Sequence, residues 1–330
     1  MRETLSRALV EIATRDPRVL LLTGDHGYSL FDAFRAECGG QYVNAGVAEQ
    51  GMVGIAAGFA KGGFRPIVYG LSAFIPVRVY EQVKLDVCYE RLPVCFLGDG
   101  AGMVYSTLGT SHQCTEDIAA LRALPNLVLL SPADGTEMSR CLELAMEFDG
   151  PVHIRIGKAD LGEVSNDSLH GGRATFGLGD LRPVRPSDGS IAWLATGSMV
   201  HVALKAASHW PGSGVWSVPS LKPLDRRQVT SICRSHSLVV TLEEHTIYGG
   251  LGGAVSEIAA EECPTWILRI GVEDRFSQMC GSYAYLQTEH GLDVASVCRA
   301  VSGFCARHGL ALPSDPVRSD AMGSDPRKAG

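Results

Sequence analysis

The chain has 330 residues, with 29 lysines and arginines against 36 aspartates and glutamates, so its formal net charge is −7. Hydrophobic residues make up 45% of the sequence, which is enough for a large core and too much for a disordered chain. The acidic balance argues against a nucleic-acid or membrane-surface partner, and no apolar run approaches the roughly 18–20 residues of a membrane span.

The first half of the chain alternates helical and apolar segments. Leu5, Leu9 and Ile12 recur at helical spacing, Asp16-Pro17 breaks the pattern, and residues 19–22 read as a buried strand. Further helices are predicted over residues 49–60, 75–90, 115–124 and 134–147. Further strands are predicted over residues 66–69, 93–97, 127–130 and 152–156. Apolar strands separated by helices predict a parallel sheet covered on both faces, in a domain spanning residues 1–160.

The composition changes after this domain. Residues 161–189 are rich in Asp, Ser, Gly and Pro and predict a linker. A second α/β pattern covers residues 190–312, with strands over 191–195, 215–218, 238–242 and 266–270 and helices over 199–209, 225–234, 250–261 and 293–307. Residues 313–330 have no apolar period and predict a disordered tail. The predicted fold class is therefore α/β, with two consecutive parallel-sheet domains.

The cysteines and the first residues indicate the compartment. Ten cysteines are scattered without a C-x-x-C pair, mostly inside predicted helices and strands, as small buried hydrophobic residues are. Zinc and a secreted disulfide framework are both disfavoured. Residues 1–10 carry charges inside an apolar helical pattern and lack a small-residue cleavage site, so they predict a helix and not a signal peptide. A cytoplasmic location fits these features best.

The segment most informative about function is Asn44-Ala45-Gly46-Val47-Ala48-Glu49-Gln50-Gly51. A glycine-containing loop leads Glu49 onto the first turn of an apolar helix. A carboxylate is electrostatically favoured at a helix N-terminus and needs no further role there. The alternative is a carboxylate held at a buried site, where it shares a proton with a ligand nitrogen.

Gly46-Val47-Ala48-Glu49-Gln50 resembles the G-x-A-E-Q signature of the pyrimidine-binding domain in thiamine-diphosphate enzymes of the transketolase and 1-deoxyxylulose-5-phosphate synthase group. The resemblance implies that Glu49 hydrogen-bonds the aminopyrimidine of the cofactor and activates it. Phe74 is similar to the aromatic residue that stacks on that ring, with Tyr80 as a second wall. His112 lies in a loop that resembles G-P-T-H-Q, whose histidine contacts the reacting part of the sugar.

The likeness covers roughly residues 1–305, and two departures bear on the substrate. Leu108 stands where many transketolases have an Asp that reads a sugar hydroxyl, and leucine offers no acceptor. Lys158, with Arg155 three residues earlier, replaces a phosphate-binding Arg; lysine binds phosphate as a point charge and not as a planar fork. We expect an unusual or unphosphorylated acceptor sugar, and we expect Arg155 and Lys158 to contact the substrate.

Three residues after the first strand are further candidates. Asp25 ends that strand, at the sheet edge where open α/β folds bind ligands. The resemblance implies a contact with the cofactor, although a turn residue would need no function. His26 either faces the substrate or caps the turn. Ser29 aligns with a substrate-phosphate contact of the family.

Two glycine motifs imitate ligand sites. Gly98-Asp99-Gly100 followed by Asn126 fits the family's magnesium motif superficially, but this stretch already aligns with the loop before the sugar-binding histidine. We therefore expect no metal site on this chain. The resemblance places Mg²⁺ and the diphosphate on a second polypeptide, the N-terminal subunit, in a heterotetramer with two copies of each. The segment Gly249–Gly253 is similar to a dinucleotide fingerprint, yet close helix packing explains it better.

Together these features predict the C-terminal subunit of a two-component, thiamine-diphosphate-dependent transketolase. Such a subunit takes part in moving a two-carbon ketol unit from a ketose (phosphate) donor to an aldose acceptor. Two alternatives stay open. One is the beta subunit of a 2-oxoacid or acetoin dehydrogenase-type complex, and the Thr110-Ser111-His112-Gln113 loop favours the sugar enzyme over it. The other is a non-catalytic subunit that retains the fold.

Overall fold

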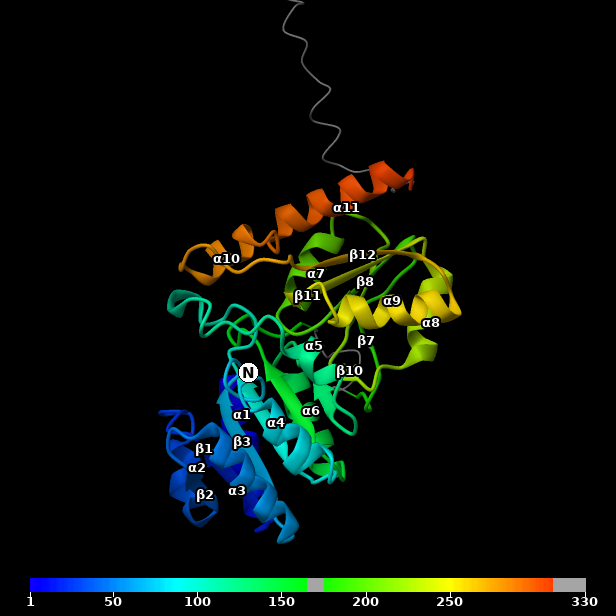
Figure 1. Cartoon of the computed structure of the whole chain (residues 1–330). Coiled ribbons are helices and arrows are strands. Elements are labelled where there is room, and N and C mark those ends of the chain that lie inside the picture. The colour runs from blue at the N-terminus through cyan, green and yellow to red at the C-terminus, as the bar shows by residue number, and fades with distance from the viewer. Residues whose placement is uncertain (165–174, 311–330) are drawn as a thin grey trace, which may run out of the picture.

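The structure, a computed structural model, describes residues 1–164 and 175–310 (Figure 1). The first domain is built on a seven-stranded sheet of order β10-β5-β6-β4-β3-β1-β2. Its strands are β1 (Val19–Thr23), β2 (Tyr42–Asn44), β3 (Arg65–Leu71), β4 (Cys95–Asp99), β5 (Val128–Leu130), β6 (Val152–Ile156) and β10 (Ser220–Lys222). Its helical segments are α1 (Arg2–Arg15), α2 (Asp32–Glu37), η1 (Gly39–Gln41), α3 (Glu49–Lys61), α4 (Tyr80–Gln82), η2 (Val83–Cys88), η3 (Ser106–Leu108), α5 (Asp117–Arg122) and α6 (Gly135–Glu147).

The second domain is built on a five-stranded sheet of order β12-β11-β8-β9-β7. Its strands are β7 (Arg182–Arg185), β8 (Ile191–Ala195), β9 (Gly214–Ser217), β11 (Leu238–Thr246) and β12 (Trp266–Val272). Its helices are α7 (Met199–Ala207), α8 (Arg226–Ser235), α9 (Leu251–Glu262), α10 (Tyr283–Glu289) and α11 (Val294–His308). Figure 1 shows α11 lying along the outer side of this domain.

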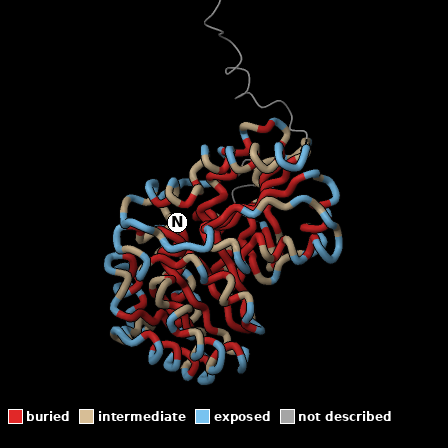
Figure 2. The backbone as a smooth tube through the Cα atoms, turned by 45° about the horizontal axis from the view of Figure 1, so that its top comes forward, coloured by how far each residue is buried: buried red, intermediate tan, exposed pale blue. Residues whose placement is uncertain are grey.

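The central strands of both sheets are buried on their two faces, and Figure 2 shows buried backbone, in red, running through the interior. Alternate side chains of a strand point to opposite faces, so Leu20 and Leu22 enter one core and Leu21 enters another. The core under α3 continues into the second domain, where it includes Val229 of α8 and Val255 of α9. This shared core packs the two domains against each other.

The prediction of two consecutive parallel-sheet α/β domains is confirmed, with the difference that each sheet has one antiparallel edge strand. β10 pairs antiparallel with β5, and β7 pairs antiparallel with β9. β10 comes from the second half of the chain and extends the first sheet. β7 lies inside the segment predicted as a linker, whose residues 165–174 are outside the described residues, as is the predicted tail over 313–330.

Some helices differ from the pattern in the sequence. The helix expected over residues 75–90 begins only at Tyr80, after a turn that contains Pro76, and it widens over η2 into a π-helix. Besides the edge strands β7 and β10, the sequence pattern does not predict the helices α2 and α10 or the short strand β2. All ten cysteines are free thiols. Every helix in the described parts of the chain is too short or too polar to cross a membrane.

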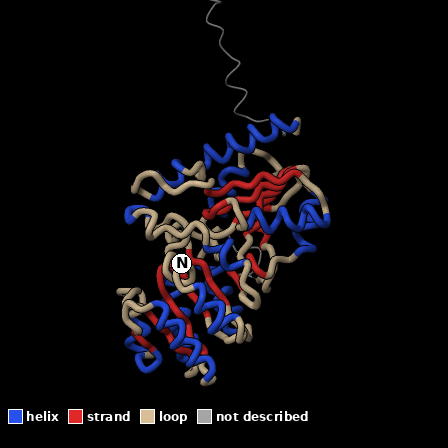
Figure 3. Tube along the Cα trace, viewed as in Figure 1, coloured by secondary structure: helices blue, strands red, loops and turns tan. Residues whose placement is uncertain are grey.

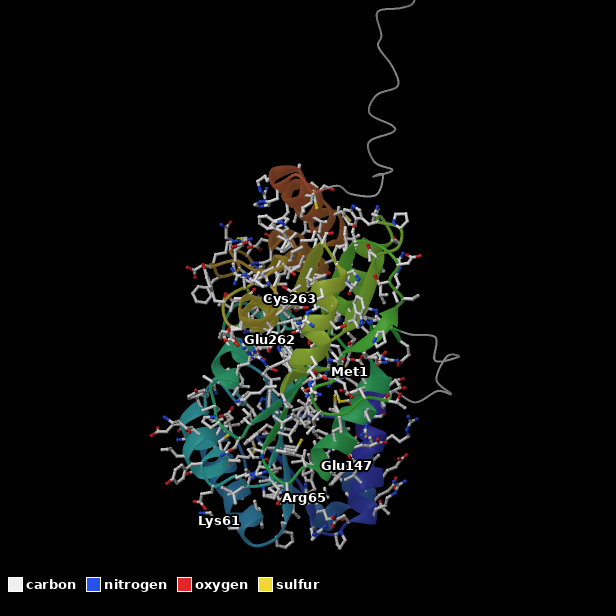
Figure 4. All side chains as sticks on the ribbon, turned by 90° about the vertical axis from the view of Figure 1, so that its right-hand side faces the viewer. Met1, Lys61, Arg65, Glu147, Glu262 and Cys263 are labelled. Atoms are coloured by element: carbon white, nitrogen blue, oxygen red, sulfur yellow. The ribbon has the colours of Figure 1, made fainter. Side chains whose placement is uncertain are left out.

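The carboxyl ends of the parallel strands of the first sheet point toward the second domain. Lys61 and Arg65 flank the turn that enters β3, and both lie at the far end of the first domain in Figure 4. β1, β3 and β4 run parallel, so the loops that follow Thr23, Leu71 and Asp99 emerge together at the opposite end. Figure 3 shows loops gathered there, where the two domains meet.

One buried histidine gives the fold a pH dependence. His153 of β6 is fully buried, and within the described parts of the chain neither ring nitrogen has a hydrogen-bond partner. Burial lowers the pKa of His153 to about 4. Because the unfolded chain binds a proton near pH 6.5 and the folded chain resists it, stability is complete above that pH and falls as the pH drops toward 4.

We expect His153→Leu to remove this acid sensitivity, because leucine has similar bulk and no proton to take up. The wild-type chain should lose about 3 kcal/mol more than the variant between pH 7 and pH 4, from roughly 1.4 kcal/mol for each unit of pKa shift. Urea unfolding at a series of pH values measures the difference. Parallel pH curves for the two proteins would show that His153 does not titrate as its burial demands.

Candidate active site

Glu49 is the first residue of α3, and the preceding loop is tied to the end of β1. The Ala45 amide donates to the Thr23 carbonyl over 2.8 Å, and the Gly46 amide donates to the Asn44 side-chain oxygen over 2.9 Å. Gly46 has a φ of 71°, a left-handed conformation that favours glycine. The loop thus places Glu49 at the sheet edge, and Glu49 is only 7% exposed there.

Phe74 lies in the turn after β3, where its amide donates to the Leu71 carbonyl over 2.8 Å. The Phe74 ring lies among several of the candidate residues. The ring centroid lies 5.4 Å from that of His112 and 6.4 Å from that of His26. The guanidinium of Arg78 lies 3.8 Å from the Phe74 centroid and 3.3 Å from a Glu49 oxygen. The rings of Phe74, His112 and His26 therefore lie together, and Arg78 connects this group to Glu49.

Sequence reasoning missed Arg78. The signal was present, because Arg78 follows Phe74 by four residues on the same short segment before α4. The helix predicted over residues 75–90 includes Arg78 but begins after Phe74, so it directs Arg78 neither to the Phe74 ring nor to Glu49. The turn around Pro76 instead brings Arg78 over the Phe74 ring.

The loop that carries His112 is held against the second domain. The His112 amide donates to the Gly109 carbonyl over 3.0 Å, and the Ser111 hydroxyl lies 3.0 Å from His112 Nδ1. Next to it, the Ser277 hydroxyl donates to the Gln113 side-chain oxygen over 2.8 Å. A second-domain residue thus holds the loop at the position next to the predicted sugar-binding histidine.

Asp25 and Ser29, the other candidates near β1, have different surroundings from those of Glu49, Phe74 and His112. Asp25 has a φ of 62° and accepts from the Asn44 side chain over 3.4 Å, so it has a structural role in the loop beside Glu49. Ser29 lines a cavity of about 810 Å³ against α1, whose lining does not include Glu49, Phe74 or His112. The contacts proposed for Asp25 with the cofactor and for Ser29 with phosphate stay predictions.

Tyr80 and Lys158 have contacts with other parts of the protein. Tyr80 is half-buried against the core under α3. The Lys158 ammonium lies 2.9 Å from an Asp160 oxygen and 5.7 Å from the centre of the Tyr283 ring. Their roles as a cofactor wall and a substrate contact also stay predictions.

The expectation of a substrate contact at Arg155 is corrected by the structure. Arg155 is 2% exposed, and its Nε donates to both carboxylate oxygens of Asp117 over 3.0 and 2.9 Å. A second nitrogen donates to the carbonyls of Cys114 and Glu244 over 3.3 and 2.7 Å. These hydrogen bonds engage Nε and one terminal nitrogen of the buried Arg155 within the protein, where they link the His112 loop, α5 and the second domain.

The residues that imitate a metal motif have structural partners. The Asp99 carboxylate accepts from the hydroxyls of Tyr69 and Tyr105 over 2.7 and 3.1 Å. The side chain of Asn126 donates to the Cys88 carbonyl over 3.0 Å, in a turn where Asn126 has a φ of 67°. These hydrogen bonds explain both residues without a metal ion. Among the described residues no group of three or more His, Cys, Asp or Glu is arranged to hold one.

The backbone amides at the glycine-rich start of α9 likewise bind a side chain of the protein itself. The Glu243 carboxylate accepts from the amides of Leu251 and Gly252 over 2.7 and 2.8 Å. A side chain at Gly250 would meet that carboxylate at 2.0 Å, so close packing requires glycine. An internal anion therefore occupies the helix N-terminus that a dinucleotide would need.

The cluster fits one half of a thiamine-diphosphate site. A buried carboxylate, able to share a proton with a ring nitrogen, stands beside an aromatic face, with imidazoles from two loops around it. Fold and site thus define the chain as a pyrimidine-binding domain followed by a second α/β domain.

Comparison with known proteins supports this assignment of the two domains. The family model for the transketolase pyrimidine-binding domain matches residues 1–163, and that for the transketolase C-terminal domain matches residues 179–297. The chain is 32% identical over 305 residues to the 6-deoxy-6-sulfo-D-fructose transketolase subunit SqwH of Clostridium sp. (strain MSTE9), covering 91% of this chain and 92% of the relative. It belongs to the transketolase family, whose members depend on thiamine diphosphate, and corresponds to the C-terminal subunit of a two-component transketolase.

Two further relatives define the extent of the likeness. The chain is 35% identical over 310 residues to 1-deoxy-D-xylulose-5-phosphate synthase 2 of Geobacter sulfurreducens, with 91% of this chain matched to 48% of that longer protein. A solved structure titled as a split-gene transketolase, an inactive beta4 tetramer, superposes with a TM-score of 0.80. It shares 32% identity and covers 92% of this chain and 96% of its own.

Proposed function

We propose that the chain, together with an N-terminal subunit and thiamine diphosphate, transfers a two-carbon ketol unit from a ketose (phosphate) donor to an aldose acceptor. The observation that supports this most is the meeting of Glu49, Phe74 and His112 from three separate loops at one sheet edge. When bound, the cofactor would supply the electron sink that this transfer needs.

The residues would divide the work as follows. Glu49 would hold and return a proton at a pyrimidine nitrogen, a task for which a buried carboxylate at a helix N-terminus is suited. Phe74 would stack on the pyrimidine, with Tyr80 and Asp25 completing that side. His112 would orient the sugar hydroxyls, with His26, Ser29 and Lys158 as further substrate contacts.

The partner would supply the diphosphate and Mg²⁺ site, in a heterotetramer with two of each subunit. Several relatives are named as subunits of transketolases, and one solved relative is described as an inactive tetramer of beta chains. The structural hydrogen bonds of Asp99 and Asn126 support the assignment of the metal ligands to the other chain. The free cysteines fit a cytoplasmic location.

The acceptor would be an unusual or unphosphorylated sugar. Leu108, on the loop of His112, is 54% exposed and offers no hydrogen-bond acceptor to a sugar hydroxyl. Arg155 is committed to Asp117, and the Lys158 ammonium is paired with Asp160. Two relatives are named for uncommon ketoses, 6-deoxy-6-sulfo-D-fructose and apulose-4-phosphate; these names favour uncommon sugars as substrates, on the donor side of the transfer.

Reconstitution with the N-terminal subunit tests this function. The two purified chains, with thiamine diphosphate and Mg²⁺, should transfer a two-carbon unit from ketoses in a substrate panel, and neither chain alone should do so. Uncommon or unphosphorylated aldoses should be the better acceptors in that panel. Ordinary preference for pentose phosphates would contradict the acceptor, and turnover of 2-oxo acids with lipoyl acceptors would contradict the ketol transfer itself.

A further inference from the structure

Arg78 contacts both the ring of Phe74 and the carboxylate of Glu49 in the candidate site. Its guanidinium carbon lies 3.8 Å from the centroid of the Phe74 ring, which places the cation on the ring face. Its Nη1 lies 3.3 Å from Glu49 Oε1. The Glu49 side chain is only 9% exposed, so little of its carboxylate is accessible to a ligand while Arg78 is in contact with it.

A guanidinium and an aminopyrimidine make similar demands on their surroundings. A guanidinium is planar, donates hydrogen bonds in its plane and stacks on aromatic faces. The ring nitrogen, carbon and amino group of an aminopyrimidine form a planar N–C–N unit of the same kind. A ligand that stacked on Phe74 and bonded Glu49 would therefore need the place that Arg78 takes.

Arg78 can leave this place without disturbing the fold. Its side chain is 48% exposed. Val79, the next residue, and Ile75, three residues earlier, are both fully buried and anchor the backbone. Rotation of one half-exposed side chain is therefore enough to uncover Phe74 and Glu49.

We propose that Arg78 competes with the coenzyme for Glu49 and Phe74, so that the coenzyme enters only as Arg78 moves aside. Arg78 thereby sets the affinity of the subunit for its coenzyme. This inference rests on the proposed function, because it presupposes an aminopyrimidine at this site. The measured dissociation constant equals the intrinsic one divided by the fraction of molecules in which the site is open.

The test is the dissociation constant of thiamine diphosphate, measured by calorimetry with Mg²⁺ on the complex of both subunits and without any sugar. Arg78→Ala should bind the coenzyme more tightly, by about tenfold if Arg78 fills the site about 90% of the time. Arg78→Lys should also bind more tightly, because it keeps the charge but loses the planar fork. Loss of a positive charge alone would weaken binding of the anionic diphosphate, so general electrostatics predicts the opposite result for Arg78→Ala.

Arg35 provides a matched control. It also stacks on an aromatic ring, 5.5 Å from the centroid of Tyr42, and it pairs with Asp32 outside the site. Arg35→Ala should leave the dissociation constant unchanged. Equal or weaker coenzyme binding by both Arg78 variants would overturn the role of Arg78 alone. Failure of the wild-type complex to bind thiamine diphosphate would overturn the proposed function, and this inference with it.

Discussion

Glu49→Gln is expected to lower ketol transfer by the reconstituted enzyme by about 10²–10⁴-fold, the usual range for loss of a positioned acid–base group. Glutamine keeps the shape of the side chain at the start of α3, but its amide cannot hold and return a proton. The rate at saturating coenzyme measures the loss. Exchange of the proton on the coenzyme's reactive carbon for deuterium, followed by NMR without sugars, should slow in parallel.

Glu90→Gln is the matched control, because Glu90 is a half-exposed glutamate that pairs with Lys61 over 2.6 Å, outside the candidate site. It should turn over like the wild type. Unchanged turnover in Glu49→Gln would contradict the acid–base role and favour a non-catalytic subunit that retains the fold. Slow turnover with normal deuterium exchange would instead place the effect of Glu49 on the sugar and not on the coenzyme.

Arg155→Met should lower the free energy of unfolding by about 3–5 kcal/mol, as expected when one partner of a buried ion pair is removed. The carboxylate of Asp117 is fully buried and would lose its countercharge. The carbonyls of Cys114 and Glu244 would each lose a donor as well. Urea unfolding of the full chain measures the loss.

Two further variants separate charge from packing. In the double variant Arg155→Met with Asp117→Leu, most of the loss should be recovered, because no uncompensated charge is left inside. Lys61→Met, which breaks the exposed pair with Glu90, should cost at most about 1 kcal/mol. If Arg155→Met were as mild as Lys61→Met, Arg155 would not be the link between the domains described above.

The strands and most helices could be predicted from the sequence because they follow simple periods. β5 and the first four residues of β1 are unbroken apolar runs, which is the pattern of strands covered on both faces. The edge strands β7 and β10 could not be predicted in this way. Both are short, and each lies beside a proline or includes one, so that their pairing depends on which sheet edge the chain reaches.

The residues of the candidate site likewise fall into those that the sequence predicts and those that it does not. Glu49, Phe74 and His112 sit in motifs, and parallel strands bring the loops after their carboxyl ends together. The pairing of Arg78 with Glu49 and of Arg155 with Asp117 depends on side-chain directions over 29 and 38 residues of separation. Charge alone does not show that one arginine is turned to the site and the other is enclosed between domains.

The strand β10 has a consequence for dissecting the molecule. The hydrogen bonds that complete the outer edge of the first sheet come from residues 220–222, beyond β8 and β9 of the second. A fragment ending between the domains would leave β5 as an open edge, which invites strand pairing between molecules. The two halves are therefore interleaved along the chain and are not interchangeable modules, and a gene cut between them would yield an aggregating product.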